Sequence, residues 1–265
     1  MAKIGFIGMG NMGYAILNGL LKLYRPQDIL FTDVNKERME YVKAQTGVSY
    51  VDTNAELANQ TEILFLAVKP QFYGSVLKNI KYVVKAEQII VSIAPGITIE
   101  SLKKSLGDDK RIVRAMPNTP ALLCEGMTGV TYEKELFTIE EQNRIREMFE
   151  SFGRMEIVEE RLMSAVVCAS GSSPAYVYMF IEALADSVVR CGMPRDKAYS
   201  FAAQAVKGAA EMVLQTGKHP GQLKDEVCSP AGTTIEGVAA LEEYGFRNAV
   251  LKANEACYKR SEGIK

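Results

Sequence analysis

The chain has 265 residues, 48% of them hydrophobic, and its 31 basic residues nearly balance its 32 acidic ones. A chain of this size has enough apolar side chains for one large core or two ordinary domains, and its composition shows no bias toward disorder. No basic stripe alternates with aromatic residues, so the electrostatic footprint of a nucleic-acid-binding protein is missing. We expect a globular protein with no nucleic-acid partner.

The cysteines and the single histidine argue against disulfides and against a metal site. The five cysteines are odd in number and widely spaced, which is typical of neither a disulfide framework nor a zinc site. His219 has no second histidine to act with as a metal ligand, so a structural or exposed role is expected for it. We predict a cytoplasmic protein with no bound metal.

An apolar run near the N-terminus, residues 3–21, superficially resembles a signal peptide. Glycines and asparagines interrupt the run, and no small-residue cleavage site follows it. No other stretch reaches the ~18 apolar residues that a membrane-spanning helix needs. No membrane partner is therefore expected.

The first part of the chain alternates short β-branched runs with amphipathic stretches. Strands are predicted at 3–8, 29–33, 63–68, 88–93 and 111–116, and helices at 11–23, 35–45, 53–59, 71–79 and 98–105. This alternation implies right-handed βαβ units and a doubly wound, mostly parallel sheet. A strand at 126–133, a helix at 138–153 with Thr138 and Glu141 as its capping box, and the strand RMEIVEE (154–160) complete this α/β Rossmann domain.

After residue 162 the strand patterns end and long helical periods follow. Helices are predicted at 174–191, 194–215, 233–243 and 246–260. Small residues are abundant on these helices, as in FAAQAVKGAAEMV (201–213), which favours close helix packing, including packing against a second subunit. We therefore predict a Rossmann domain at 1–162 and an all-α C-terminal dimerisation domain at 163–265.

The motif GMGNMG (8–13) follows the first strand directly and opens a helix, as dinucleotide binding requires. Its first glycine permits a tight turn, its second lets the backbone approach a pyrophosphate, and its third lets helix and strand pack closely. Asp33, twenty residues beyond Gly13 at the end of the second strand, completes the fingerprint. The predicted cofactor-binding residues here are Gly8, Met9, Gly10, Asn11, Met12, Gly13 and Asp33.

The choice between the two nicotinamide cofactors stays open on these residues. Asp33 suits a free ribose hydroxyl and so favours NADH. The extra phosphate of NADPH could instead be bound by Asn35, Lys36 and Arg38, although Asp33 would repel its charge.

Three further segments follow predicted strands at the sheet edge where open α/β folds bind ligands. AVKP (67–70) and APG (94–96) are assigned to the cofactor cleft, with a solvated loop as the alternative for each. In RAMPNTPA (114–121) two prolines hold the backbone extended and fix Asn118 and Thr119 next to the expected nicotinamide, a plain rigid turn being the alternative. The cofactor assignments in the first two segments are Ala67, Val68, Lys69, Pro70, Ala94 and Gly96.

Two later phrases place small hydroxyl residues just before a helix. In SGSSPAY (170–176), Ser172 or Ser173 is expected to cap a helix whose first turn contains Pro174. In CSPAGTTIEG (228–237), Thr233 and Glu236 are expected to form a capping box. Capping needs only one such residue, and the surplus glycine and hydroxyls at a positive helix end favour binding of a small carboxylate at 229–234.

Six segments in order resemble the pyrroline-5-carboxylate reductase family over nearly the whole chain: IGFIGMGNMG, AVKP, RAMPNTPA, SGSSPAYVYMFIEALADS, HPGQLKDEVCSPAGTTIEGV and LEEYGFR. The long C-terminal phrase is the most specific, whereas the glycine motif is common to many dehydrogenases. The resemblance implies reduction of 1-pyrroline-5-carboxylate to L-proline with NADPH or NADH, the last step of proline biosynthesis. It also implies a homodimer, or an assembly of dimers, through the C-terminal helices.

Site residues carried over by this resemblance complete the prediction. Asn54 stands near the adenosine phosphate, and Thr234 is the hydroxyl nearest the imine and the candidate catalytic residue. The candidate substrate site consists of Asn118, Thr119, Ser172, Ser173, Gly232, Thr233 and Thr234. Two residues depart from the family: Asp33 replaces a small or basic residue, and Ala231 replaces the usual glycine of SPGGTT, where a methyl group would tighten the loop.

Two other functions fit parts of the sequence. A β-hydroxyacid dehydrogenase has the same two-part architecture but needs a positioned acid, usually a lysine on the first helix of its second domain. The segment from Gly171 to Arg195 has no lysine or histidine, which favours an imine over a ketone, although Lys207 and Lys252 lie on later helices. A non-catalytic nucleotide sensor would not need SSPAY, NTP and SPAGTT to meet at one cleft.

Overall fold

The computed structural model describes residues 2–264 and contains two compact units. The first unit runs to Ser172 and includes the C-terminal segment from Tyr258, and the second unit is Ser173–Cys257. The observed division therefore lies after Ser172, whereas the sequence pattern placed it after residue 162. The difference arises because the turns that follow residue 162 pack on the sheet, where Met163 is buried.

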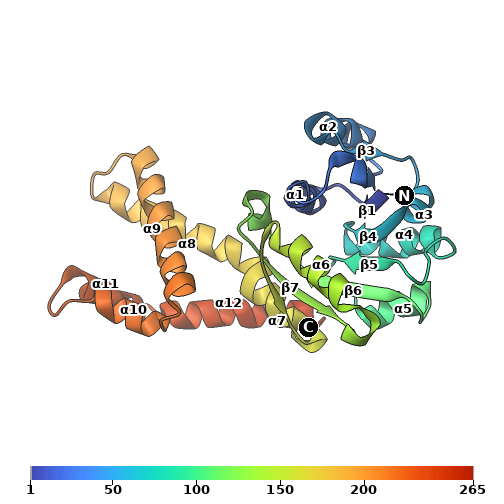
Figure 1. The fold of residues 1–265 in the computed structure, drawn as a ribbon. Coiled ribbons are helices and arrows are strands. Elements are labelled where there is room, and N and C mark those ends of the chain that lie inside the picture. Colours follow the sequence, from blue (N-terminus) through green and yellow to red (C-terminus); the bar gives the residue numbers. More distant parts are fainter. Residues whose placement is uncertain (1, 265) are drawn as a thin grey trace. The chain divides into compact units, whose positions relative to one another are not determined.

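Eight strands form a single sheet in the first unit, in the order β3-β2-β1-β4-β5-β6-β7-β8 (Figure 1). All neighbouring pairs are parallel except β6 with β7, so the predicted doubly wound, mostly parallel sheet is confirmed. Only β3 was not predicted, because two residues are too short for a periodic pattern. The strands are β1 (Ala2–Ile7), β2 (Ile29–Thr32), β3 (Ser49–Tyr50), β4 (Thr61–Leu66), β5 (Ile89–Ser92), β6 (Arg111–Met116), β7 (Gly126–Tyr132) and β8 (Gly153–Ile157).

The helices of the first unit connect these strands, and the predicted helices are present with small shifts at their ends. The capping box of Thr138 and Glu141 is confirmed. The helices are α1 (Asn11–Leu20), α2 (Lys36–Thr46), α3 (Asn54–Gln60), α4 (Tyr73–Ile80), α5 (Ile99–Leu106), α6 (Ile139–Glu150), α7 (Met163–Val166) and the π-helical η6 (Val167–Ser172). Short 3-10 turns are η1 (Pro26–Asp28), η2 (Pro70–Phe72), η3 (Thr119–Leu123), η4 (Lys134–Leu136) and η5 (Glu160–Leu162).

Helices cover both faces of this sheet and bury two separate hydrophobic cores. One core contains Ile16 of α1 and Phe149 of α6, and the other contains Leu77 of α4 and Leu102 of α5. Successive residues of a strand point to opposite faces, so Phe65 and its neighbour Leu66 on β4 enter different cores. This arrangement explains why the strands read as continuous apolar runs in the sequence.

The second unit is entirely helical, as predicted, and has a very small core of its own. Its helices are α8 (Ser173–Arg190), α9 (Arg195–Thr216), α10 (Pro220–Val227), α11 (Thr233–Glu243) and α12 (Phe246–Ser261), of which α10 was not predicted and α12 ends within the first unit. The buried hydrophobic residues between α8 and α9 are Ala185, Ala198 and Ala202. Large apolar side chains such as Met179 and Phe201 are instead exposed.

Two predicted helix caps are wrong. The N-cap of α11 is Gly232, with no side-chain hydrogen bond to the helix end, so Thr233 is already the first helical residue and forms no capping box. Neither Ser172 nor Ser173 caps a helix start, because η6 ends at Ser172 and α8 begins at Ser173 without a break. The missing N–H of Pro174 is accommodated beside the wider π-helical turns of η6.

Residues 160–190 form the one helical run, within the described residues 2–264, that is long and apolar enough to cross a membrane by length and composition alone. The sequence count of apolar residues did not find it, because serines, a glycine and a proline interrupt the apolar residues without adding charge. Only 6% of its apolar window is buried.

Candidate cofactor and substrate site

The turn between β1 and α1 requires glycine at two of its positions. Gly8 has φ +95°, and a Cβ atom there would lie 2.7 Å from the carbonyl oxygen of Ala67. A Cβ atom on Gly13 would lie 2.6 Å from the carbonyl oxygen of Gly8. A Cβ atom on Gly10, in contrast, would meet no atom within 4 Å. The first and third glycines thus shape the turn, while the second leaves space open.

This open space belongs to a cleft of about 430 Å³. The cleft lies at the carboxyl ends of β1, β4, β5 and β6, beside the point between β1 and β4 where the strand order reverses. In open α/β sheets this is the position of the ligand crevice. The predicted residues that line it are Gly10, Asn11, Met12, Ala67, Val68, Lys69, Pro70, Ala94, Asn118 and Thr119.

The residues around the cleft fit a dinucleotide. Gly10 is the N-cap of α1, and no side chain caps this helix end. The positive end of α1 therefore points its backbone N–H groups toward the open cleft, as the binding of a pyrophosphate requires.

Other cleft residues were not assigned from the sequence. Ile93, Pro95, Met116, Pro117 and Gly171 also line the cavity. Pro95, Met116 and Pro117 lie within segments that the pattern did identify at strand ends, and Ile93 directly precedes one of them. Gly171 does not follow a predicted strand, so its place at the strand ends was not expected from the sequence. Only folding brings η6 against the end of β6, where a Cβ atom on Gly171 would lie 3.2 Å from Met116 Cε.

One acidic side chain directly after β2 and one basic side chain at the start of α2 lie beside the glycine turn. Asp33 Oδ2 accepts a hydrogen bond from the Met9 N–H at 2.6 Å, and Asp33 Oδ1 accepts one from the Asn35 N–H at 2.9 Å. Arg38 Nε donates to the Met9 carbonyl oxygen at 2.8 Å, and the Arg38 guanidinium carbon lies 4.9 Å from the ring centroid of Tyr14. Asp33, directly after β2, and Arg38, in the first turn of α2, therefore present the two opposite charges that bear on cofactor choice.

Several predicted cofactor residues lie outside the lining of the cleft. The Met9 side chain is fully buried in the core, and Asn35 caps α2 by accepting a hydrogen bond from the Arg38 N–H. Lys36 is exposed, Asn54 is the first residue of α3, and Gly96 has φ +74° in the loop after Ala94 and Pro95.

Asn118 lies at the cleft but uses its side chain inside the protein. Its residue is 8% exposed, Nδ2 donates to the Ser170 carbonyl oxygen at 3.0 Å, and Oδ1 accepts from the Met127 N–H at 2.9 Å. The amide therefore holds together the turn after β6, the start of β7 and η6. Thr119 is exposed and lines the cavity.

A buried tyrosine links two strands below the cleft. The Tyr73 hydroxyl donates to the Leu66 carbonyl oxygen at 2.7 Å and lies 3.0 Å from Ser92 Oγ. These partners end β4 and β5, just before Ala67 and Ile93 reach the cleft. Burial raises the pKa of the Tyr73 phenol to about 12, because the charged phenolate would lose its solvation.

The second unit contains the remaining predicted residues, at the start of α11. Gly232 is the N-cap, and a Cβ atom there would lie 2.4 Å from Ser229 Oγ. Thr233 and Thr234 are exposed in the first helical turn. Ala231, before them, has φ +54°, the left-handed region that favours glycine. Ser172 and Ser173 are half-buried at the junction of η6 and α8.

Two protein-family models match the chain. Residues 3–96 match the family described as NADP oxidoreductase coenzyme F420-dependent, and residues 160–264 match pyrroline-5-carboxylate reductase dimerisation. The first match contains the glycine turn and AVKP, and the second contains the whole of the helical unit.

Full-length relatives and solved structures agree with these models. The chain is 49% identical to pyrroline-5-carboxylate reductase of Escherichia coli over 264 residues, with 99% of this chain and 98% of the relative covered. It is 43% identical to that of Methanosarcina acetivorans, with 96% of each covered. The Coxiella burnetii pyrroline-5-carboxylate reductase structure matches with a TM-score of 0.91 and 31% identity, covering 100% of this chain and 98% of that one. The Plasmodium falciparum pyrroline carboxylate reductase with NADP bound matches with a TM-score of 0.88 and 33% identity, covering 99% and 98%. The chain therefore belongs to the pyrroline-5-carboxylate reductase family.

Proposed function

We propose that this protein reduces 1-pyrroline-5-carboxylate to L-proline with NADPH or NADH, the final step of proline biosynthesis. The observation that carries the proposal is the uncapped N-terminus of α1, opening at Gly10 onto a cleft at the switch point of the sheet, in a chain 49% identical to a reductase of this name. The bound cofactor would supply the hydride that the cyclic imine accepts at its C=N carbon.

The chain's own residues would bind and orient the cofactor. The N–H groups at the start of α1 suit the pyrophosphate, and the backbone from Ala67 to Pro70 forms the opposing wall of the cleft. Ala94 and Thr119 lie further along the cavity, toward the strands β5 and β6. Asn54, carried over from the family, is proposed near the adenosine phosphate.

Cofactor choice is proposed to depend on Arg38 and Asp33. The Arg38 guanidinium is held by the Met9 carbonyl and lies over Tyr14 and Tyr41, so it is a pre-oriented cation for a 2′-phosphate. Both Asp33 oxygens accept backbone N–H groups, which spreads part of the carboxylate charge but does not remove it. We propose that the protein uses both cofactors, because Arg38 attracts the phosphate that Asp33 repels.

The substrate carboxylate is proposed to bind at the N-terminus of α11. Gly232 leaves this helix end without a side-chain cap, and Thr233 and Thr234 are exposed there. Backbone N–H groups at a positive helix end suit a small carboxylate. Ser172 and Ser173 are kept as proposed substrate residues from the family resemblance, whereas Asn118 is proposed to act by holding the wall of the cleft.

Thr234 is the proposed catalytic residue. Because the nitrogen of a cyclic imine is basic, it can be protonated without a strong general acid, and a hydroxyl is sufficient to orient it and to relay a proton from water. Thr234→Val is expected to lower kcat while the dissociation constant of NADPH stays unchanged. Thr234→Ser should recover most of kcat, and an unchanged kcat in Thr234→Val would remove the residue from the mechanism.

The activity itself is tested by comparing two substrate classes. Oxidation of NADPH and of NADH is followed with 1-pyrroline-5-carboxylate, and reduction of NADP+ and NAD+ is followed with a panel of 3-hydroxy acids. The proposal expects turnover of the imine and none of the hydroxy acids. Cofactor binding without turnover of any cyclic imine would instead support a nucleotide sensor.

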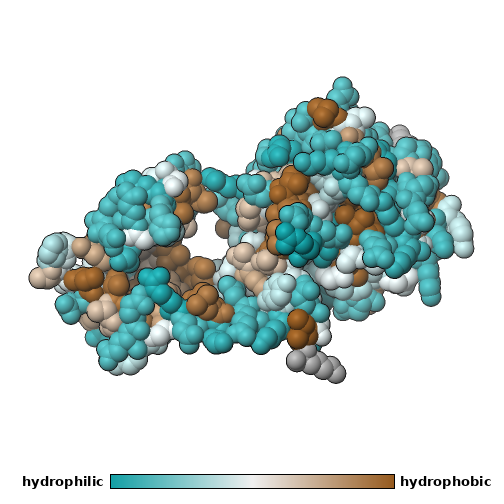
Figure 2. Space-filling model, turned by 90° about the horizontal axis from the view of Figure 1, so that it is seen from below, coloured by the Kyte–Doolittle hydropathy of each residue, from teal (hydrophilic) through white to brown (hydrophobic). Residues whose placement is uncertain are grey.

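We propose that the protein forms a homodimer, or an assembly of dimers, through its C-terminal helices. A groove of about 570 Å³ in the second unit is lined by apolar residues that include Met179, Phe180, Leu241 and Phe246. Figure 2 shows apolar surface, in brown, exposed between the helices of this unit. Because so few residues of this unit are buried, its exposed apolar side chains need a further apolar surface that covers them. Phe180→Glu should shift the light-scattering mass toward the monomer, while Lys252→Glu on α12 should not.

Domain roles and compartment follow as proposals. We propose that residues 1–162 bind the cofactor and that residues 163–265 serve dimerisation and substrate binding. The cytoplasm is the proposed compartment, because the five cysteines are odd in number and widely spaced, which is not typical of a disulfide framework.

A further inference from the structure

We propose that Glu160 is a positioning residue for the far end of the cofactor cleft, the end lined by Pro95, Met116 and Gly171. This inference rests on the proposed function. One oxygen, Glu160 Oε1, accepts two hydrogen bonds, from the Ile99 N–H at 2.9 Å and from Arg114 NH1 at 2.9 Å. Ile99 is the first residue of α5, so the Glu160 carboxylate binds the backbone at the start of this helix.

The three residues of this clasp, Glu160, Arg114 and Ile99, belong to three segments that each lead to the cleft. Ile99 follows the loop that leaves β5 through Ala94 and Pro95. Arg114 lies on β6, two residues before Met116 and on the same face of the strand. Glu160 lies in η5, at the start of the turns that reach Gly171. One oxygen atom of Glu160 therefore connects three segments of the chain, and each of these segments continues to residues that line the cleft.

Because Arg114 and Glu160 are largely shielded from solvent, water cannot easily take the place of the hydrogen bond between them. The Arg114 side chain is 10% exposed and the Glu160 side chain 34%. Without Glu160 the guanidinium would remain in a largely buried place with no carboxylate, which favours movement of the surrounding backbone.

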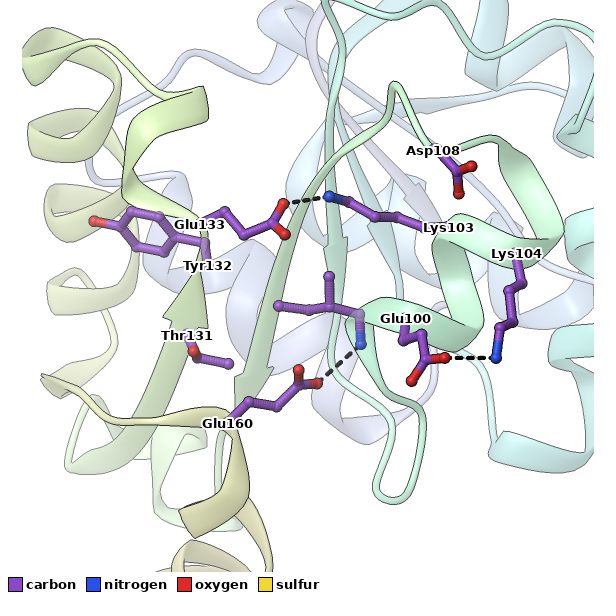
Figure 3. A pocket seen from close by; sticks show the side chains of 9 residues that line it. Glu100, Lys103, Lys104, Asp108, Thr131, Tyr132, Glu133 and Glu160 are labelled. Carbon is purple, nitrogen blue, oxygen red and sulfur yellow. Dashed lines mark hydrogen bonds and ion pairs between the residues drawn. The ribbon is translucent and has the colours of Figure 1, made fainter.

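Other charged side chains around Glu160 form ion pairs of their own. Glu160 and Ile99 line a cavity of about 530 Å³ on the sheet unit, together with Glu100, Lys103, Lys104 and Glu133 (Figure 3). Lys103 pairs with Glu133, and Lys104 pairs with Glu100. Both lysines of this cavity therefore have carboxylate partners other than Glu160. Glu133 pairs with a neighbouring side chain in the same cavity and provides a matched control.

The experiment compares Glu160→Ala, Glu160→Gln and Glu133→Gln with the unmodified protein. Hydrogen exchange without cofactor should show faster exchange of the Ile99 amide in Glu160→Ala only. In the reductase assay, Glu160→Ala should lower kcat by about ten- to a hundredfold, because small displacements of a reacting group cost that much. The dissociation constant of NADPH, which is set largely at the glycine turn, should change less than about threefold, a difference of well under 1.4 kcal/mol. Glu160→Gln keeps an oxygen acceptor for Ile99 and should recover most of kcat.

A primary isotope effect with 4-deuterated NADPH separates positioning from general stability. The effect should increase in Glu160→Ala, because a misplaced wall makes hydride transfer more rate-limiting. The inference is overturned if kcat and the isotope effect match those of Glu133→Gln, or if Glu160→Ala loses kcat only in proportion to its folded fraction. If Glu160→Ala does not fold, the double change Glu160→Met with Arg114→Met removes the charge problem, and full kcat in that variant would equally overturn it. An unmodified protein that fails to reduce the imine would instead count against the proposed function, while the exchange result would still report on the clasp.

Discussion

The side-chain amide of Asn118 donates to the carbonyl oxygen of Ser170 at 3.0 Å. Ser170 lies within the π-helical η6, and Pro174, four residues later, has no N–H to donate back along the helix. The Asn118 amide thus ties η6 to the turn after β6. The same amide accepts the Met127 N–H at 2.9 Å.

Asn118→Ala should therefore destabilise the protein. It would remove two hydrogen bonds and leave the half-buried Met127 N–H group without its acceptor, at a cost of about 2–4 kcal/mol. Urea unfolding measures the change. Asn143→Ala, at an exposed position of α6, serves as the control and should stay within about 0.5 kcal/mol of the unmodified protein. Equal midpoints for the two variants would show that the Asn118 amide does not hold this wall.

Substitutions at two positions of the glycine turn should affect folding and cofactor binding separately. Gly13→Ala places a Cβ atom 2.6 Å from a carbonyl oxygen and should lower the melting temperature. Gly10→Ala places its Cβ atom in open space, so the fold should be retained while NADPH binding weakens at least tenfold, because the methyl group occupies the approach of the pyrophosphate. Differential scanning fluorimetry and fluorescence titration with NADPH measure the two effects. A Gly10→Ala variant that binds NADPH normally would place the pyrophosphate elsewhere.

Cofactor preference should change in opposite directions at the end of β2. Arg38→Ala should lower kcat/KM with NADPH about tenfold or more and affect NADH much less, because the cation for the 2′-phosphate is lost. Asp33→Asn should raise the ratio of NADPH to NADH use by about tenfold, since it removes the repelling charge and keeps the side-chain shape. Lys43→Ala, at an exposed lysine of the same helix α2, is the control for a general loss of positive charge. Parallel shifts for both cofactors in Arg38→Ala would contradict the assignment.

Tyr73 should make stability depend on pH in the alkaline range. Its pKa is raised from about 10 to about 12 in the folded protein, so the folded state holds its proton more tightly than the unfolded state. The contribution is fully present below pH 10 and is lost as the pH rises through about 12, a total of about 3 kcal/mol from two pKa units. Urea unfolding at a series of pH values tests this.

In Tyr73→Phe the decrease in the free energy of unfolding at alkaline pH should become smaller. The free energy of unfolding should also be lower by about 1 kcal/mol at every pH, because the hydrogen bond to Leu66 is missing. Tyr82→Phe, at an exposed tyrosine, is the control. An alkaline decrease of the same size in Tyr73→Phe would assign the effect to another group.

Ala231→Gly should stabilise the loop before α11. Ala231 is held at φ +54°, where an L-residue is strained and glycine is not. After allowing for the greater freedom of glycine in the unfolded chain, the gain should be about 0.5–1 kcal/mol. Ala239→Gly, at an exposed position within α11, should cost about 1 kcal/mol instead. If both changes destabilise the protein, the left-handed conformation at Ala231 is not what limits this loop.

Much of the architecture could be predicted because it depends on local pattern. Apolar runs of strand length, helical periodicity and the Thr138 capping box are properties of neighbouring residues, and each was found where the pattern placed it. The helix caps at Ser172, Ser173 and Thr233 were wrong for a related reason. Hydroxyl residues near a helix start favour capping, but the backbone conformation decides which residue is the N-cap, and at α11 that residue is Gly232.

By itself, then, the sequence determined the order of strands and helices, the doubly wound sheet and the glycine turn, since these follow from periodicity and from the steric freedom of glycine. Only the tertiary structure decided that Gly171 meets Met116, that Asp33 is bound by the Met9 N–H, and that a single oxygen of Glu160 joins Ile99 to Arg114. Such contacts connect residues distant along the chain, and no local pattern encodes them, because they arise only when both sheet faces are covered and buried polar groups must find partners.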